Sequence, residues 1–262
     1  MSKLRRVLLA VLMLLGSVAP ALACGVSVQR GGLLHRASLV AAEGGVTTIT
    51  LLGHASFLIE SPGGVSAVTD YSGRHTPPRV PDIVTMNHAH STHFTDAPDV
   101  RIAHVLRGWR DDGGPAQHDL KVGDVRVRNL PTNIRGWDGG TRRYGNSIFV
   151  FEMGGLCIGH LGHLHHLLTA DDLAVLGQLD IVMVPIDGAW TSNQGDMVEV
   201  LGQLNARIIL PMHYWSQEVL GRFLARMRDK AEIRLADTDS FTVSRATLPV
   251  TPQVLVLPAP YF

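Results

Sequence analysis

The stretch Asp82–His93 reads Asp-Ile-Val-Thr-Met-Asn-His-Ala-His-Ser-Thr-His, and it joins a short strand-like segment to a histidine-rich loop. The segment Asp82–Met86 is typical of a buried strand because it is short and mostly apolar. A loop attached to the end of a rigid strand is a common place for functional residues. Imidazole is a frequent ligand of transition metals, so three neighbouring imidazoles indicate a metal site at this strand end.

Two further histidine-bearing segments also follow predicted strands. His160–His166 reads His-Leu-Gly-His-Leu-His-His and comes after the predicted strand Leu156–Gly159. Pro211-Met212-His213-Tyr214 comes after Ile208–Leu210. A single histidine after a strand is more often structural than a metal ligand. His213 is therefore a candidate ligand only because the other two segments also carry histidines. Together, the three strand ends are expected to converge on one edge of the fold.

The composition of the 262 residues restricts the class of protein. A hydrophobic content of 45% is enough for a buried core and excludes a disordered chain. Lys and Arg number 23, as do Asp and Glu, and this balance argues against a nucleic-acid binder, which needs a basic face. The two cysteines, Cys24 and Cys157, cannot make a disulfide-rich scaffold. We expect Cys157, in a predicted strand, to be a small buried hydrophobic residue.

The N-terminus has the pattern of a secretory signal peptide. A basic start precedes the apolar run Val7–Leu15, and Ala21-Leu22-Ala23 fits a cleavage site. That run is shorter than the roughly 20 apolar residues of a membrane-spanning helix, and no other segment is predicted to span a membrane. We expect residues 1–23 to be a signal peptide, residues 24–45 an entry segment, and the mature protein periplasmic or secreted. Cleavage after residue 23 leaves Cys24 first, so a lipid anchor on Cys24 is an alternative.

The remaining chain, residues 46–262, is predicted to form one domain in which strands precede most of the helices. Two sheets packed face to face, with helices outside, would accommodate that order. The predicted strands, besides those above, are Thr47–Leu52, Phe57–Glu60, Val65–Thr69, Ser147–Glu152 and Ile181–Val184. The predicted helices are Ala170–Leu176 with Thr169 as its N-cap, Met197–Leu204, and a third that begins after Ser216.

The order of these motifs resembles the metallo-β-lactamase superfamily, and within it the ascorbate-phosphate-lactonase-like branch of metal-dependent hydrolases. The resemblance covers roughly residues 46–230 and implies an α/β fold, the four-layer αβ/βα sandwich, with a metal centre at one edge. The motifs that carry it are Gly53-His54-Ala55-Ser56-Phe57-Leu58-Ile59-Glu60, Asp70, His88–His93, Asn146, His160–His166 and Pro211–Tyr214.

Three positions depart from the family pattern. Thr92 stands where the family loop has an aspartate, His163 replaces the aspartate that bridges two metals, and Asn133 stands where a further histidine is expected. A carboxylate supplies negative charge and a second oxygen, whereas a neutral imidazole offers one lone pair. Two divalent ions would therefore be poorly compensated in a low-dielectric cleft. One ion, zinc or alternatively iron, is the expected cofactor.

The resemblance, together with the residues of this chain, suggests candidate roles. The expected metal ligands are His88, His90, His93, His163 and His213. Residues expected to support the ligands from outside are His54, Asp70, His160 and His166, and Asp187 is a candidate catalytic carboxylate. The stretch Asn133–Arg143, with Arg135, Arg142 and Arg143, is expected to be a solvated loop, or a rim that receives an anionic substrate.

Two functions are compatible with these residues. The first is an exported hydrolase that attacks an ester, lactone or phosphoester of a small molecule through a metal-bound hydroxide. The second is a non-catalytic metal-binding or assembly protein on the same fold, which Thr92 and His163 favour because the lost carboxylates position the nucleophile. The substrate and the oligomeric state are not encoded in any motif that we recognise.

Overall fold

Apolar side chains project from both faces of the first sheet. The computed structural model describes Cys24 and residues 45–136 and 138–258. It contains two sheets, and the first has six strands in the order β13-β1-β2-β3-β4-β5. In β2, Phe57 and Ile59 point toward the second sheet, whereas Leu58 points away from it. The strands are β1 (Thr47–Gly53), β2 (Ser56–Glu60), β3 (Ser66–Val68), β4 (Ile83–Met86), β5 (His104–Arg107) and β13 (Ser240–Val243).

The second sheet has eight strands in the order β12-β14-β11-β10-β9-β8-β7-β6. Its central strands β10 and β11 are parallel and buried along their whole length, which explains their continuous apolar sequence. The strands are β6 (Asp119–Val122), β7 (Val125–Arg135), β8 (Thr141–Met153), β9 (Leu156–His160), β10 (Ile181–Pro185), β11 (Ile208–Met212), β12 (Glu232–Leu235) and β14 (Gln253–Val256).

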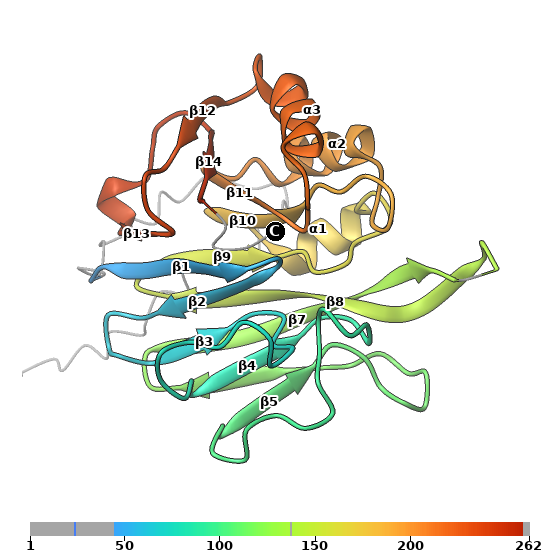
Figure 1. The fold of residues 1–262 in the computed structure, drawn as a ribbon. Coiled ribbons are helices and arrows are strands. Elements are labelled where there is room, and N and C mark those ends of the chain that lie inside the picture. The colour runs from blue at the N-terminus through green and yellow to red at the C-terminus, as the bar shows by residue number, and fades with distance from the viewer. Residues whose placement is uncertain (1–23, 25–44, 137, 259–262) are drawn as a thin grey trace, which may run out of the picture.

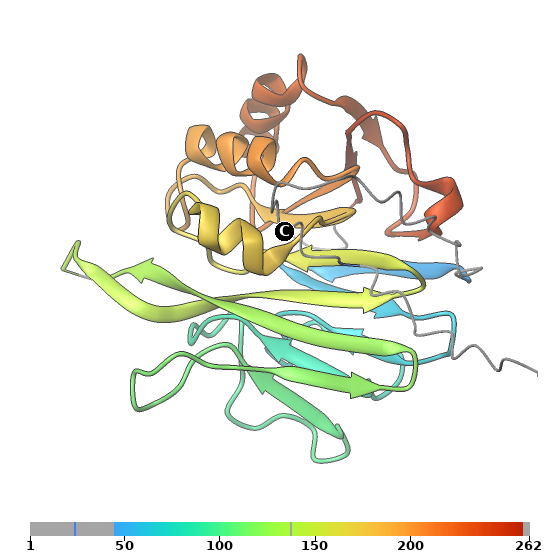
Figure 2. The same ribbon diagram turned by 180° about the vertical axis from the view of Figure 1, so that it is seen from behind.

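Three α-helices pack against the outer face of the eight-stranded sheet (Figures 1 and 2). They are α1 (Ala170–Leu176), α2 (Gln194–Leu204) and α3 (Gln217–Met227), and a 3-10 turn follows at Arg245–Thr247. The predicted caps are confirmed: the side chains of Thr169 and Ser216 accept hydrogen bonds from backbone amides in the first turns of α1 and α3. Helix α2 begins three residues earlier than predicted, because the Asn193 side chain accepts a hydrogen bond from the Asp196 amide.

The outer face of the six-stranded sheet is covered by loops in the described part of the chain. A cluster that includes Leu58, Val68, Tyr71, Met86 and Trp109 fills this side. Prolines at positions 77, 78, 81 and 98 oppose helix formation in the covering segments. The predicted α/β sandwich of two sheets is confirmed. The helical layer that the four-layer arrangement expects outside the six-stranded sheet is replaced by loops in the described residues.

The prediction of a loop over Asn133–Arg143 is wrong. Strands β7 and β8 form a long antiparallel hairpin through this region, which projects beyond the rest of its sheet (Figures 1 and 2). Charged residues and glycines in this segment obscure the alternation of apolar and polar residues that predicts a strand. In the structure, Ile134 is buried and pairs with Arg142 on the neighbouring strand.

A disulfide joins Cys24 to Cys157, which lie 133 positions apart in the sequence. Cys157 is buried in a strand as predicted, but it is not a free thiol. The bond occupies the Cys24 sulfur, to which a lipid would otherwise be attached. The predicted signal peptide and most of the entry segment lie outside the described residues. Within the described chain, the helices are too short or too polar to cross a bilayer.

We predict that Cys24→Ser lowers the free energy of unfolding by about 2–4 kcal/mol, because the cross-link restricts a long segment of the unfolded chain. Urea unfolding of the oxidised wild type and the variant measures this difference. A reductant should destabilise the wild type and leave the variant unchanged. Equal stability of the oxidised proteins would contradict the prediction.

Candidate metal centre

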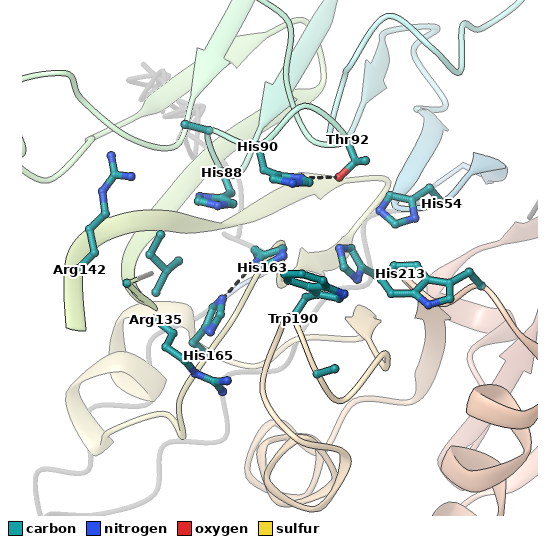
Figure 3. Close-up of a pocket in the computed structure, with 15 residues that line it drawn as sticks. His54, His88, His90, Thr92, Arg135, Arg142, His163, His165, Trp190 and His213 are labelled. Atoms are coloured by element: carbon teal, nitrogen blue, oxygen red, sulfur yellow. Dashed lines mark hydrogen bonds between the residues drawn. The ribbon is translucent and has the colours of Figure 1, made fainter. Parts of the chain in front are cut away.

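Strand ends from both sheets bring the histidines to one edge of the sandwich (Figure 3). His54 follows β1, His88 follows β4, His163 follows β9 and His213 follows β11. The pocket there has a volume of about 410 Å³, and its histidines are His54, His88, His90, His163, His165 and His213. The convergence predicted for the three histidine segments is therefore present in the structure.

The closest group of ligand atoms belongs to His54, His93 and His213, with one ring nitrogen from each lying within 4.8 Å of the other two. His163 is adjacent, with its ring centroid 5.0 Å from that of His93 and 5.1 Å from that of His213. The ring centroid of His88 lies 4.9 Å from that of His163. The ring of His93 is fully buried at the centre of these contacts.

Two buried carboxylates orient the two histidines at the heart of this group. Asp70 Oδ2 lies 2.7 Å from His93 Nδ1, and Asp187 Oδ1 lies 3.2 Å from His213 Nδ1. An ionised carboxylate only accepts hydrogen bonds, so each Nδ1 carries a proton, and in the neutral tautomer that this fixes the lone pair lies on Nε2. The two Nε2 atoms face each other at 3.0 Å. A cation held between them would relieve the repulsion of two lone pairs.

The backbone at these positions adopts a conformation that side-chain-bearing residues rarely take. His54, Asp70 and His213 have φ values of 51°, 44° and 55°, in the left-handed region. Strain of this kind persists only where surrounding contacts impose it, and it concentrates at functional sites. The His213 amide donates to the carbonyl of His54, which ties the two strained positions to each other.

His88 and His90 are also oriented through Nδ1. His88 Nδ1 donates to the carbonyl of Gly145 at 2.7 Å, which leaves its Nε2 free to accept. His90 Nδ1 is hydrogen-bonded to Thr92 Oγ1 at 2.9 Å. Thr92 therefore fixes a neighbouring histidine from the position at which the family pattern has an aspartate.

His163 is held by its neighbours in the His160–His166 segment. Its amide donates to Asn146 Oδ1 at 2.8 Å, and its Nδ1 is hydrogen-bonded to His165 Nε2 at 2.8 Å. Gly162, with φ of 58°, lets the loop pass close to the Asn146 side chain. A Cβ at position 162 would lie only 2.5 Å from Asn146 Oδ1. The loop conformation that presents His163 therefore depends on a glycine at position 162.

Burial keeps these histidines in the form that binds metals. It lowers the pKa of His93 far below its usual value, and the nearby His213 and His88 lower it further. Burial is also the largest cause of the lowered pKa of His163, ahead of the influence of His93. Burial lowers the pKa of His165 to about 4, with Arg135 adding to the effect. Neutral imidazoles are metal ligands, whereas imidazolium is not.

The buried chemistry of the site fits a metal ion. His54 Nε2 is buried without a hydrogen-bond partner among the described residues, and it belongs to the three-histidine group. A buried nitrogen without a hydrogen-bond partner destabilises the folded protein unless a ligand binds to it. Carboxylates behind metal-bound histidines are a common outer arrangement, and Asp70 and Asp187 occupy such positions here.

Several sequence-predicted roles change in the structure. Asp187 is not an available catalytic carboxylate, because its oxygens accept from the amides of residues 189–191, from the Thr191 hydroxyl and from His213. His166 lies outside the pocket, with its ring nitrogens hydrogen-bonded to the backbone of Asn133 and Leu167. His54 was expected outside the ligand group, but it supplies one of its three nitrogens.

Asp70 and His160, both expected to support the ligands, lie close to the histidine group. Asp70 contacts His93, and His160 lies beside Asp70 with 3.9 Å between Nε2 and Oδ2. Both ring nitrogens of His160 are engaged: Nε2 donates to the Ala55 carbonyl, and Nδ1 accepts from the Gly162 amide. His165 was not among the expected site residues, although its position two residues after His163 in an unusually histidine-rich run is a signal for it.

The rim of the pocket has two chemically different sides. Arg135 and Arg142 lie at the left of the pocket in Figure 3, whereas Trp190 lies near its centre, between His163 and His213. Trp215 also lines the pocket, with its ring stacked on that of His54 at 6.0 Å between centroids. Arg143, expected with the other arginines, does not belong to the pocket lining.

The fold and the site together define an α/β sandwich protein with a histidine-rich candidate metal centre at one edge. The family model described as "Beta-lactamase superfamily domain" matches residues 48–213. The chain belongs to this superfamily, as the sequence motifs predicted.

Relatives with this fold include proteins named as metal-dependent hydrolases. A UPF0173 metal-dependent hydrolase from Methanoculleus marisnigri is 27% identical over 181 residues, which cover 63% of this chain and 80% of that protein. A crystal structure of a metallo-β-lactamase superfamily protein from Thermotoga maritima is 26% identical, with a TM-score of 0.59, and covers 80% of this chain and 98% of that one. The metallo hydrolase Igni18 from Ignicoccus hospitalis shares the fold, with 17% identity, a TM-score of 0.56, and coverage of 76% and 99%.

We predict that Asp70→Asn weakens metal binding about 10- to 100-fold, because the carboxylate that fixes His93 is lost. Competition with a chelating dye measures the affinity. Asp99→Asn is the control, because Asp99 pairs with Arg101 at the surface. Unchanged affinity in a folded Asp70→Asn variant would show that the His93 contact does not support metal binding.

Proposed function

We propose that this protein is an exported, zinc-dependent hydrolase with a single metal ion, and that it cleaves an ester, lactone or phosphoester of a small molecule. The observation that carries this proposal is the pair of Nε2 atoms on His93 and His213, 3.0 Å apart and each backed by a buried carboxylate. The relatives named as metal-dependent hydrolases support catalysis over the non-catalytic alternative. The Thermotoga maritima neighbour, for which Zn dependence is suggested, supports zinc.

The residues that would hold the ion are His54, His93 and His213, with His163 and His88 adjacent. When bound, such an ion polarises an acyl or phosphoryl oxygen and lowers the pKa of a coordinated water. In ester hydrolysis, water adds to the acyl carbon, the bond to the leaving oxygen breaks, and an acid and an alcohol are released. The chain fixes two of the imidazoles through Asp70 and Asp187.

Charge balance supports one ion. Asp70 and Asp187 are the carboxylates that contact the clustered histidines, and together they match the charge of one divalent cation. A second divalent cation would leave two positive charges uncompensated in a largely buried site. The aspartates that the family pattern has at positions 92 and 163 are replaced by Thr92 and His163.

The disulfide supports export. Disulfides form and persist in oxidising compartments and are rare in the cytosol. Cys24 directly follows the expected cleavage site, so it would be the first residue of the mature chain and remain linked to the body by Cys157.

We predict that the purified protein contains about one zinc ion per chain, and that His93→Ala and His213→Ala lose both the metal and about 100-fold or more of the hydrolytic activity. Elemental analysis and a screen of aryl esters, lactones and phosphodiesters measure the two properties. His104→Gln is the control, because His104 lies in β5 outside the pocket.

Each element of this proposal can fail separately. Two ions per chain would contradict the charge argument, and bound iron would contradict the choice of zinc. Metal retained without turnover on any substrate of the screen would favour the non-catalytic alternative.

We predict that the chain expressed in a bacterium with its natural N-terminus is recovered outside the cytoplasm and begins at Cys24, because the apolar run and the small residues before position 24 direct cleavage. N-terminal sequencing of the periplasmic fraction tests this. An intact N-terminus in the cytoplasmic fraction would refute export.

A further inference from the structure

The pocket lining includes two arginines and two tryptophans, and in Figure 3 the arginines lie at one end, with Trp190 near His163 and His213. Of the labelled histidines in Figure 3, His88 and His165 lie nearest to the arginines. The aromatic side adjoins His54 and His213, whose ring centroids lie 6.0 Å and 5.5 Å from that of Trp215. A molecule that spans the pocket therefore meets positive charge at one end and indole rings beside His213.

The two arginines are available to a ligand. Neither guanidinium forms an ion pair within the described chain, and both side chains are exposed. No carboxylate belongs to the pocket lining in the described part of the chain, because Asp70 and Asp187 lie behind the histidines. The side chains of several other arginines in the structure are paired with acids, among them Arg126 with Asp119 and Arg128 with Glu152. A planar guanidinium suits a carboxylate or phosphate group. The two side chains leave opposite faces of the β7–β8 hairpin, because Arg142 pairs across the strands with Ile134 and Arg135 pairs with Thr141 (Figure 3), so they offer two separate positions for such a group.

The two tryptophans expose apolar surface at the pocket. Trp190 is 58% exposed and Trp215 is 47% exposed, although both are large aromatic residues. The Trp190 amide donates to Asp187 Oδ2, so the carboxylate that orients His213 also fixes this loop. Rigid exposed indoles beside a pocket are suited to stacking against a flat apolar group.

We propose, building on the hydrolase function, that the substrate is an amphiphilic anion in which an anionic oxyacid group and a flat apolar group flank the bond that is cleaved. Either Arg135 or Arg142 binds the anionic group, and Trp190 and Trp215 bind the apolar group. The histidines then face the middle of the molecule, where the scissile bond lies. A pocket of about 410 Å³ has room for a small molecule of this kind.

Calorimetric titration of the metal-loaded protein with non-hydrolysable probes tests the arginine side. The probes are 2-naphthoate, naphthalene-2-phosphonate and the neutral 2-naphthamide. We expect the wild type to bind at least one anion about tenfold more tightly than the amide, and the preferred anion distinguishes carboxylate from phosphate recognition. The Arg135→Gln/Arg142→Gln double variant should lose this preference.

Arg143→Gln is the matched control, because Arg143 lies on the same strand but outside the pocket lining. It should retain the wild-type preference. A preference that persists in the double variant would mean that the metal alone selects the anion, and it would overturn the proposal. Equal binding of the anions and the amide by the wild type would also overturn it.

Substitution of the tryptophans tests the aromatic side. Trp190→Leu/Trp215→Leu should weaken the affinity for 2-naphthoate about tenfold and change the affinity for acetate less than twofold, because acetate has no aromatic group to stack. Equal losses for 2-naphthoate and acetate would contradict aromatic recognition.

A matched pair of esters separates this inference from the proposed function. 4-Nitrophenyl glutarate carries a free carboxylate, and 4-nitrophenyl valerate has a similar chain without it. We expect a higher kcat/KM for the glutarate, and loss of that difference in the arginine double variant. Binding preferences without hydrolysis of either ester would refute the hydrolase but retain the pocket assignment. Hydrolysis of both esters at equal kcat/KM would refute the substrate class but retain the hydrolase.

Discussion

The site depends on two buried carboxylate–imidazole pairs, Asp70 with His93 and Asp187 with His213. Each carboxylate fixes the proton of its partner on Nδ1 and directs the lone pair of Nε2 inward. The two pairs come from different sheets, since Asp70 follows β3 and His213 follows β11. Packing of the two sheets therefore brings the lone pairs together. Asp70 and His213 adopt left-handed backbone conformations in this arrangement, which are energetically unfavourable for residues with side chains.

The arrangement places negative charge behind the metal-binding nitrogens rather than among them. With Thr92 and His163 at family aspartate positions, the compensating charge comes from carboxylates that touch imidazoles. Such a centre offers neutral donors to an ion and leaves more of its charge to act on a substrate. The disulfide ties Cys24 to β9, and arginines and tryptophans line the pocket that contains the histidines.

The sequence predicted most of the fold because its signals were local. Continuous apolar runs located β10 and β11, and Thr169 with Gly177 located both ends of α1. The β7–β8 hairpin was missed because its outer half carries arginines and glycines, and the pairing that stabilises it is between strands. The Cys24–Cys157 bond was missed because cysteines 133 positions apart carry no local signal of contact.

The sequence by itself determined that histidines follow several strands of an α/β sandwich, because strand periodicity and residue identity are written in consecutive positions. Only the tertiary structure decided what each histidine does. His160 has both nitrogens occupied, His166 turns away from the pocket, and His54 joins the central group. The direction of an imidazole lone pair is set by its hydrogen-bond partner, and for the central histidines that partner comes from distant parts of the chain.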